Sequence, residues 1–337
     1  MSNVLSPRPA AIAACSLLAA GLGILASDYW ISILVLVGIY AIVATGLNLF
    51  MGYTGQTSFG HNAFAAIGGY TTAIMTTAYG WPPVPVAILG AAFAALIAAL
   101  IGYSVLYLKV RGHYLGMATL GLGLIVVELA IEMERITNGT AGISGVPPIG
   151  IGDLEIASSR GMYWLLLVLV PFAIWCAHRI ATSRLGRALK AISGDEQAAE
   201  ALGINASAHI LVAFVVSAVF AAAGGSLLVH QLAFVSPEVF GMFFLTLLFT
   251  VLYVGGVGTT FGPLIGALVI VLVPEALRGF ADFRELIYGI FLIVVVVFVP
   301  GGLPSASSWG PALGWFRAYR RSAHSSAANR PSPRQEH

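Results

Sequence analysis

Charged residues are scarce in this chain. They make up 9% of its 337 residues, whereas hydrophobic residues make up 58%. An average soluble domain is about one quarter charged. So few charges cannot cover the surface of a soluble globule of this length, which excludes a soluble globular protein. We therefore expect lipid to be the main solvent.

Two residue types that often carry chemistry are also rare. Both cysteines, Cys15 and Cys176, lie inside apolar runs, where cysteine behaves as a small hydrophobe, so we expect neither a disulfide nor a metal site. Neither of the two lysines, Lys109 and Lys190, follows a glycine. The chain therefore lacks a G-x-x-x-x-G-K-[ST] phosphate loop and is not expected to bind ATP itself. We predict no catalytic and no metal-binding residue.

Long hydrophobic runs are plentiful. A helix needs roughly 20 apolar residues to cross about 30 Å of hydrocarbon. On that basis the chain is predicted to be an all-α polytopic membrane protein with about ten spans, some of them broken by glycine. The predicted spans are 10–26, 30–50, 59–78, 84–107, 113–131, 162–179, 207–230, 241–256, 262–277 and 285–300.

The basic residues predict how these spans are oriented. If both termini are cytoplasmic, 12 of the 16 basic residues fall on the cytoplasmic side and four outside, as the positive-inside rule expects. Residues 1–9 then form a cytoplasmic N-terminus, and 10–303 form the transmembrane domain. Residues 304–337, rich in Arg, Ser and Pro, form a disordered cytoplasmic tail. The first run could be a signal peptide, but we expect a retained span because the second run follows almost at once.

Two glycine clusters interrupt the spans, at 52–62 and 255–263. Each contains a threonine and then Phe-Gly before a new span, and both fall on the cytoplasmic side of the predicted topology, which suits a parallel internal repeat. Unwound backbone at membrane depth must pack in protein or line a wet cavity, and paired broken helices indicate a transport path. The alternative is that the small residues only let helices pack closely. The candidate path residues are Gly52, Gly55, Gln56, Ser58, Gly60, His61, Glu128, Gly255, Gly256 and Gly258.

Glu128 is a carboxylate inside a predicted span. Facing lipid would be costly, so we expect it either to face the bundle interior or an aqueous cavity, or to lie near enough to the outer interface to be solvated. The sequence leaves both open.

Residues 178–206 form the longest polar cytoplasmic connection between two predicted spans, and they predict two helical pieces separated by Ser193-Gly194. The first piece covers about 184–192. The second begins at Ser193 or Asp195, has acidic residues at its positive end and ends at Gly203. It presents a small apolar face (Ala198, Ala199, Ala201, Leu202) that could enter a groove on a partner. An interfacial helix on lipid is the alternative, which its acidic start disfavours.

Here the chain resembles a known family. Residues 195–205, Asp-Glu-Gln-Ala-Ala-Glu-Ala-Leu-Gly-Ile-Asn, look like the "EAA" coupling loop of ABC importer permeases, in the form found in the branched-chain amino acid permease family (LivM/LivH type). The resemblance covers about 35–303, and the outer Gly-rich segment favours a LivM-like subunit. One departure is Leu124, where LivM-like members commonly carry a glutamate; Glu128 follows one turn later. The segments that carry the resemblance are 46–49, 52–61, 111–114, 118–120, 137–147, 195–205 and 300–303.

This resemblance implies a multi-pass subunit of the bacterial inner membrane that is not itself an enzyme. The implied partners are ABC ATPase subunits that bind the ATP, a second, LivH-like permease subunit, a periplasmic binding protein and membrane lipid, with no role for nucleic acid. It implies that Asp195, Glu196, Ala198, Ala199, Glu200 and Gly203 couple the ATPase to alternating access. The implied cargo is a branched-chain amino acid.

Three other functions stay open at this point. The first is uptake of urea, amides or other small solutes by the same kind of importer. The second is a channel or secondary transporter, which would not need the helix that ends at Gly203. The third is an intramembrane serine protease, suggested by the Gly-Ile-Ser-Gly sequence around Ser144, but we see no nearby histidine to act as its base.

Overall fold

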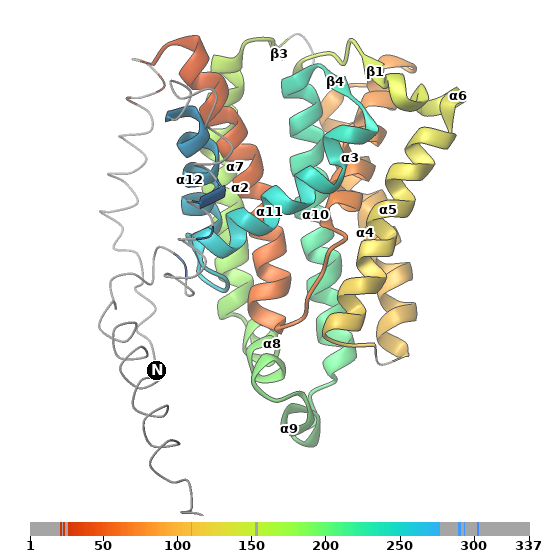
Figure 1. Ribbon diagram of the computed structural model, residues 1–337, viewed down its shortest axis with the longest axis vertical. Helices are drawn as coiled ribbons and strands as arrows, with labels where there is room; N and C mark the ends of the chain where they lie inside the picture. Colours follow the sequence, from red (N-terminus) through yellow and green to blue (C-terminus); the bar gives the residue numbers. More distant parts are fainter. Residues whose placement is uncertain are drawn as a thin grey trace, which may run out of the picture.

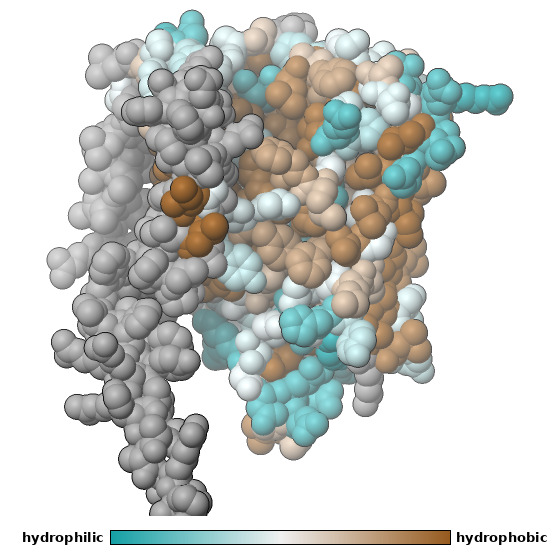
Figure 2. Space-filling view, in the orientation of Figure 1, coloured by the Kyte–Doolittle hydropathy of each residue, from teal (hydrophilic) through white to brown (hydrophobic). Residues whose placement is uncertain are grey.

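The computed structural model describes residues 21, 23, 26–108, 110–151, 154–276, 289–290, 293 and 302. Long helices run between two ends of the molecule (Figure 1). One end, here called the α9 end, carries α8 (Arg184–Gly194) and α9 (Glu196–Ala201); the opposite end, the strand end, carries four short strands. Figure 2 shows apolar residues across the middle of the visible face and a polar cluster at the α9 end.

The helices α2, α3 and α10 form the buried centre of the bundle, and the other helices surround them. α10 packs against α2, α3 and α4; α7 and α12 pack against α2; α5 packs against α3; and α11 packs against α12. The long helices are α2 (Asp28–Thr54), α3 (His61–Thr77), α4 (Pro83–Tyr107), α5 (His113–Glu132), α7 (Ser159–Thr182), α10 (Ala206–Leu232), α11 (Met242–Gly255) and α12 (Gly262–Ala276).

The surrounding helices expose large apolar side chains. Leu96 on α4, Leu124 on α5 and Val168 on α7 are all more than half exposed. Exposed apolar surface of this extent suits hydrocarbon rather than water, whereas α2 and α10 are mostly buried inside the bundle.

Within the described part of the chain, six helices are long and apolar enough to cross a membrane. They are Asp28–Thr54, Pro83–Val105, His113–Glu132, Ser159–Thr182, Ala206–Leu232 and Pro237–Gly255. Two further predicted spans correspond to α3 and α12, which are shorter, with 17 and 15 residues. The multi-pass helical architecture is thus confirmed.

Some of the predictions from the sequence concern residues that the structure does not describe. The first and last predicted spans, 10–26 and 285–300, lie largely outside the described residues, as do the N-terminus 1–9 and the tail 304–337. The total of ten spans and the cytoplasmic position of both termini therefore stay predictions.

Short strands at the strand end were not predicted. β1 (Ile143–Ser144) pairs antiparallel with β4 (Phe234–Val235), and β2 (Ile149–Ile151) pairs with β3 (Leu154–Ile156). α6 (Glu134–Thr137) and η1 (Gly139–Ala141) precede β1 in the chain, and η2 (Pro237–Phe240) follows β4. Pairs of two or three residues are too short to show an alternating pattern, so the expectation of a purely helical chain was wrong in this detail.

Glycines let α3 and α10, two of the three central helices, approach closely. A Cβ atom added to Gly225 would lie 2.0 Å from the Ala65 carbonyl oxygen, and one added to Gly68 would lie 2.2 Å from that of Ala222. Neither gap admits a methyl group, so the close packing depends on glycine. The serine Ser226 adds a hydrogen bond by donating to the Gly68 carbonyl at 3.1 Å.

Replacing Gly225 by valine is expected to force α3 and α10 apart. Overpacking against backbone should cost about 3 kcal/mol, which would lower the Tm and the yield of folded protein in detergent. Gly121→Val on α5 is the matched control, because a Cβ there would meet nothing within 4 Å. Equal thermal stability of the two variants would contradict the close-packing argument.

Candidate translocation and coupling site

The first glycine cluster forms a non-helical connection between α2 and α3. α2 ends at Thr54 because Gly55 adopts a left-handed φ of 69°, with its N–H donating to the Met51 carbonyl. Residues 55–60 then run non-helically to His61, where α3 begins. In Figure 1 this connection rises from the lower end of α2, so that α3 begins well inside the bundle.

The first residue of α3, His61, is fully buried. Its Nδ1 lies 3.1 Å from Ser58 Oγ and its Nε2 lies 3.0 Å from Ser217 Oγ of α10. The Ser217 hydroxyl donates its own proton to the Phe214 carbonyl, so its oxygen accepts the hydrogen bond from the Nε2–H of His61. The other ring nitrogen, Nδ1, then carries no proton and accepts from the Ser58 hydroxyl. The imidazole therefore fastens the broken segment to α10.

Hydrogen bonds also fasten the segment to α5. The Phe59 N–H donates to Thr119 Oγ1 at 2.9 Å, and a Cβ on Gly60 would lie 2.6 Å from the Thr119 carbonyl oxygen. Gln56, which is buried, accepts from the Gly112 N–H at 2.7 Å just before α5 begins. Backbone groups outside a helix are thus satisfied by neighbouring helices, as membrane depth demands.

The second glycine cluster, between α11 and α12, packs directly against the first. Asn48 on α2 accepts from the Gly258 N–H at 2.7 Å and donates to the Thr259 carbonyl at 2.8 Å. A Cβ on Gly52 would lie 2.6 Å from Gly258 N, so only glycine fits there. Gly256 and Gly258 have φ values of 92° and 77°, which glycine adopts without strain. The two clusters, which the sequence predicts on the same side of the membrane, are thus in direct contact.

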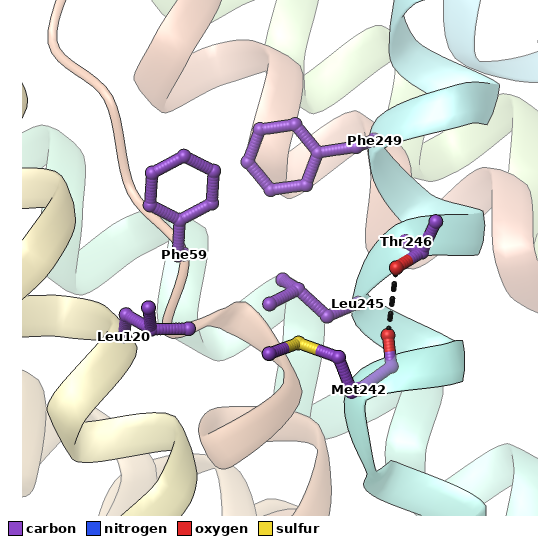
Figure 3. A pocket seen from close by; sticks show the side chains of 6 residues that line it. All are labelled: Phe59, Leu120, Met242, Leu245, Thr246 and Phe249. Atoms are coloured by element: carbon purple, nitrogen blue, oxygen red, sulfur yellow. Dashed lines mark hydrogen bonds between the residues drawn. The ribbon is translucent and has the colours of Figure 1, made fainter.

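A shallow apolar hollow opens beside the first cluster (Figure 3). It measures about 280 Å³ and lies between the broken segment, α5 and α11. The Phe59 and Phe249 rings, which both line it, stack on each other with their centres 4.8 Å apart. Thr246 turns its hydroxyl to the Met242 carbonyl at 2.9 Å, so the lining presents almost only carbon. The lining residues are Phe59, Leu120, Met242, Leu245, Thr246 and Phe249.

Glu128 lies apart from this arrangement. It is exposed on the surface of α5, one helical turn before the helix ends at Glu132. Of the two alternatives that the sequence left open, its exposed position does not fit a carboxylate that faces the interior of this helix bundle. The structure does not bring it together with either glycine cluster.

The coupling loop folds into two capped helices at the α9 end. Ser183 caps α8 by accepting from the Gly186 N–H at 3.3 Å, and Asp195 caps α9 by accepting from the Ala198 N–H at 3.0 Å. Gly203 follows with a φ of 82°, as predicted for the residue that ends the helix. α8 continues through Gly194, so the break falls at Asp195, slightly later than Ser193-Gly194.

The face that α9 presents differs from the predicted one in one residue. Ala198, Glu200, Ala201 and Leu202 are exposed, and Leu202 is 83% exposed. Ala199, however, is buried at 2% exposure. It packs inward because α9 is short and must bury one side, so it is not available to a partner.

Arg111, in the connection before α5, joins α9 to the rest of the bundle. Its Nε donates to Glu196 Oε1 at 2.8 Å and its Nη2 donates to Ser207 Oγ at the start of α10 at 2.6 Å. α8 makes separate contacts: the Lys190 ammonium lies 5.4 Å from the Tyr53 ring centre, and Ser193 Oγ would lie 2.8 Å from a Cβ on Gly55. The α8–α9 unit therefore packs against the end of α2 and the start of the broken segment.

Sequence reasoning missed the side chains that hold the broken backbone. Asn48, Thr119 and Ser217 are polar residues inside apolar runs, a signal that could have singled them out. Arg111 was considered only as a positive charge that sets topology and as part of the family resemblance. Among the described residues, no group of three His, Cys, Asp or Glu side chains is placed to hold a metal ion.

A helical membrane bundle with two joined glycine-broken connections and a capped helix pair at one end is the architecture of a transport permease. The family described as "Branched-chain amino acid transport system / permease component" matches residues 29–300, and the chain belongs to this family.

Curated relatives agree with this assignment. The chain is 32% identical to the high-affinity branched-chain amino acid transport system permease protein LivM of Escherichia coli K12, over 81% of this chain and 69% of the relative. It is 30% identical to BraD of Pseudomonas aeruginosa, over 78% and 91%, and 27% identical to LivH of Salmonella typhimurium, over 78% and 90%. No solved structure matches the chain.

Removing the Asn48 amide is expected to loosen the contact between the two glycine clusters. Asn48→Ala leaves the Gly258 N–H and the Thr259 carbonyl without their partner, which should cost about 2 kcal/mol and lower the Tm in detergent. Thr45→Val, one turn earlier on α2, is the control, because Thr45 bonds only the Ala41 carbonyl of its own helix. A Tm of Asn48→Ala no lower than that of Thr45→Val would show that the contact is dispensable.

Proposed function

We propose that this chain is the membrane-spanning subunit of an ATP-driven importer in a bacterial inner membrane. It passes branched-chain amino acids by alternating access and takes its energy from a separate ATPase that docks at α9. The observation that carries the proposal is the α8–α9 unit. It has an exposed docking face, and it is linked to the broken segment 55–60 through Arg111, which bonds Glu196, and the adjacent Gly112, which bonds Gln56.

The partners follow from what the chain lacks and from its relatives. Without a phosphate loop it needs ATPase subunits to bind the ATP. The relatives are named as permease proteins of transport systems, and LivM and LivH are both among them. This supports a LivH-like second permease subunit, with a periplasmic binding protein delivering the cargo. The α9 end, which carries Arg184, Arg187 and Lys190, faces the cytoplasm in this arrangement.

The cargo is proposed from the relatives and from the apolar hollow. The relatives' names refer to branched-chain amino acids. An aliphatic side chain suits a hollow lined by Leu120, Leu245 and the stacked Phe59 and Phe249 rings, whereas urea or a small amide would find no polar partner there. The hollow lies against segment 55–60, where broken backbone lines the proposed path.

A channel or secondary transporter is the competing function. It would account for the joined glycine clusters but not for a capped helix whose exposed face, around Ala198 and Leu202, points away from the bundle. ATPase docking therefore separates the two functions.

Blocking the α9 face should release the ATPase. Ala198→Trp places a bulky ring on the exposed face and should weaken ATPase binding about tenfold or more. Co-purification shows whether the ATPase is retained, and surface plasmon resonance gives its dissociation constant. Ala157→Trp, at an exposed site just before α7 on the strand end, is the matched control. Normal ATPase binding and uptake by both variants would refute docking at α9.

Filling the apolar hollow should slow the cargo without affecting assembly. Leu120→Trp is expected to reduce leucine uptake by about tenfold. This is the size of the change that follows when an apolar side chain loses its fit to a hydrophobic pocket. Leu129→Trp, exposed near the far end of the same helix, should transport normally. Uptake into proteoliposomes is the measurement; unchanged uptake by Leu120→Trp would remove the hollow from the path.

A further inference from the structure

The connection between α4 and α5 touches both parts of the proposed machinery. Arg111 uses its guanidinium to hold Glu196 of α9 at 2.8 Å and Ser207 of α10 at 2.6 Å, and it also donates to the Val110 carbonyl at 3.2 Å. Arginine suits this place because its rigid fork of donors bonds several acceptors at once.

The ion pair is partly shielded from solvent. The Arg111 and Glu196 side chains are 17% and 28% exposed, whereas those of Arg160 and Asp28, the pair at the strand end, are 45% and 86% exposed. Charge-assisted hydrogen bonds are short and strong, and partial burial reduces their screening by salt. The Arg111–Glu196 bond can therefore transmit displacement of α9, which an exposed pair would do poorly.

The next residue, Gly112, bonds the broken segment. The Gly112 N–H donates to Gln56 Oε1 at 2.7 Å, and Gln56 is buried in segment 55–60. Gly112 has a φ of 59°, a conformation that glycine adopts without strain and that brings its N–H into place directly beside Arg111. Two consecutive residues thus bond α9 on one side and the broken segment on the other.

Beyond Gln56 the bonds lead into the bundle centre. Ser58 bonds His61, and His61 bonds Ser217 of α10. The Phe59 ring of the same segment lines the apolar hollow. A continuous series of bonded groups therefore runs from α9 to the proposed path, and such contiguous networks can carry coupling between distant sites.

We infer that Arg111 is a positioning residue that transmits the movement of α9 to segment 55–60, and so sets how much cargo moves per ATP. This inference rests on the proposed function, since it assumes an ATPase at α9. It assigns Arg111 a role distinct from docking: the ATPase contacts the exposed face of α9, and Arg111 bonds the side that faces the bundle.

The test compares Arg111→Gln with Arg160→Gln in the complete importer. Each variant removes an arginine from one ion pair, the first at the α9 end and the second at the strand end. The importer, with its ATPase and cargo-loaded binding protein, is reconstituted in proteoliposomes, and leucine uptake and ATP hydrolysis are measured together. Arg111→Gln is expected to lower leucine moved per ATP by between about twofold and thirtyfold, with the ATPase still co-purifying. Arg160→Gln should keep the wild-type ratio.

Two further variants keep the test independent of folding. Arg111→Lys retains the charge for Glu196 but cannot also reach Ser207 in a fork, so its ratio should fall between those of Arg111→Gln and the wild type. Gln56→Met has a similar size but lacks the acceptor for Gly112, so it should also lower the ratio.

A second measurement detects the movement itself. In a background with both cysteines replaced by alanine, Thr57→Cys reports on segment 55–60 through its rate of thiol labelling. ATP should change that rate, and Arg111→Gln should abolish the change.

The outcomes separate the inference from the function on which it rests. A wild-type ratio of leucine to ATP in both Arg111→Gln and Gln56→Met would overturn the inference. So would loss of ATPase binding by Arg111→Gln, because Arg111 would then serve docking. If the wild-type permease retained no ATPase at all, the proposed function would fail instead.

Discussion

Backbone groups that leave a helix inside a membrane must find partners within the protein, because hydrocarbon offers none. Two segments of this permease, 55–60 and 256–261, leave helical geometry between helices of the bundle. Their partners come from other elements: Asn48 serves Gly258 and Thr259, and Thr119 serves Phe59. The rest of the architecture depends on these bonds, since without them the broken segments would be too costly to bury.

The same constraint makes the broken segments responsive to their neighbours. A segment whose polar groups are hydrogen-bonded to several helices is displaced when those helices shift. Segment 55–60 is bonded to the α4–α5 connection through Gln56 and to α10 through His61. If α9 moves as proposed, the bonds of Arg111 and Gly112 would connect that movement to the apolar hollow beside Phe59. Transport coupling in this account is a consequence of how buried backbone is satisfied.

Much of the fold could be predicted from the sequence, because the helices of a membrane protein are marked by long apolar runs. The predicted span 113–131 corresponds to α5 (His113–Glu132), and the resemblance led to the family that the comparisons confirm. The helix after Asp195 and its end at Gly203 were also predicted, because caps are local signals. α2 extends to Thr54, beyond the predicted 50, where the packing of Tyr53 under Lys190 supports a last turn that lacks a strong apolar pattern.

The contacts of the site could not be predicted in the same way. Asn48 and Gly258 are 210 residues apart, and Arg111 and Glu196 are 85 apart, so no local pattern reveals either pair. The inward turn of Ala199 and the exposure of Glu128 depend on how helices pack, since the identity of a residue alone does not fix which way it faces. The glycine clusters were recognisable, but the polar side chains that hold them were not.

Hydrogen–deuterium exchange of the assembled importer tests the central claim most directly. If buried side chains satisfy the broken backbone, the amides of Phe59, Gly112 and Gly258 will exchange slowly, at rates close to those of the helices around them. Peptides covering 55–60 and 256–261 that exchanged at the rate of an unstructured chain would contradict the account, because their backbone groups would then be bonded to water.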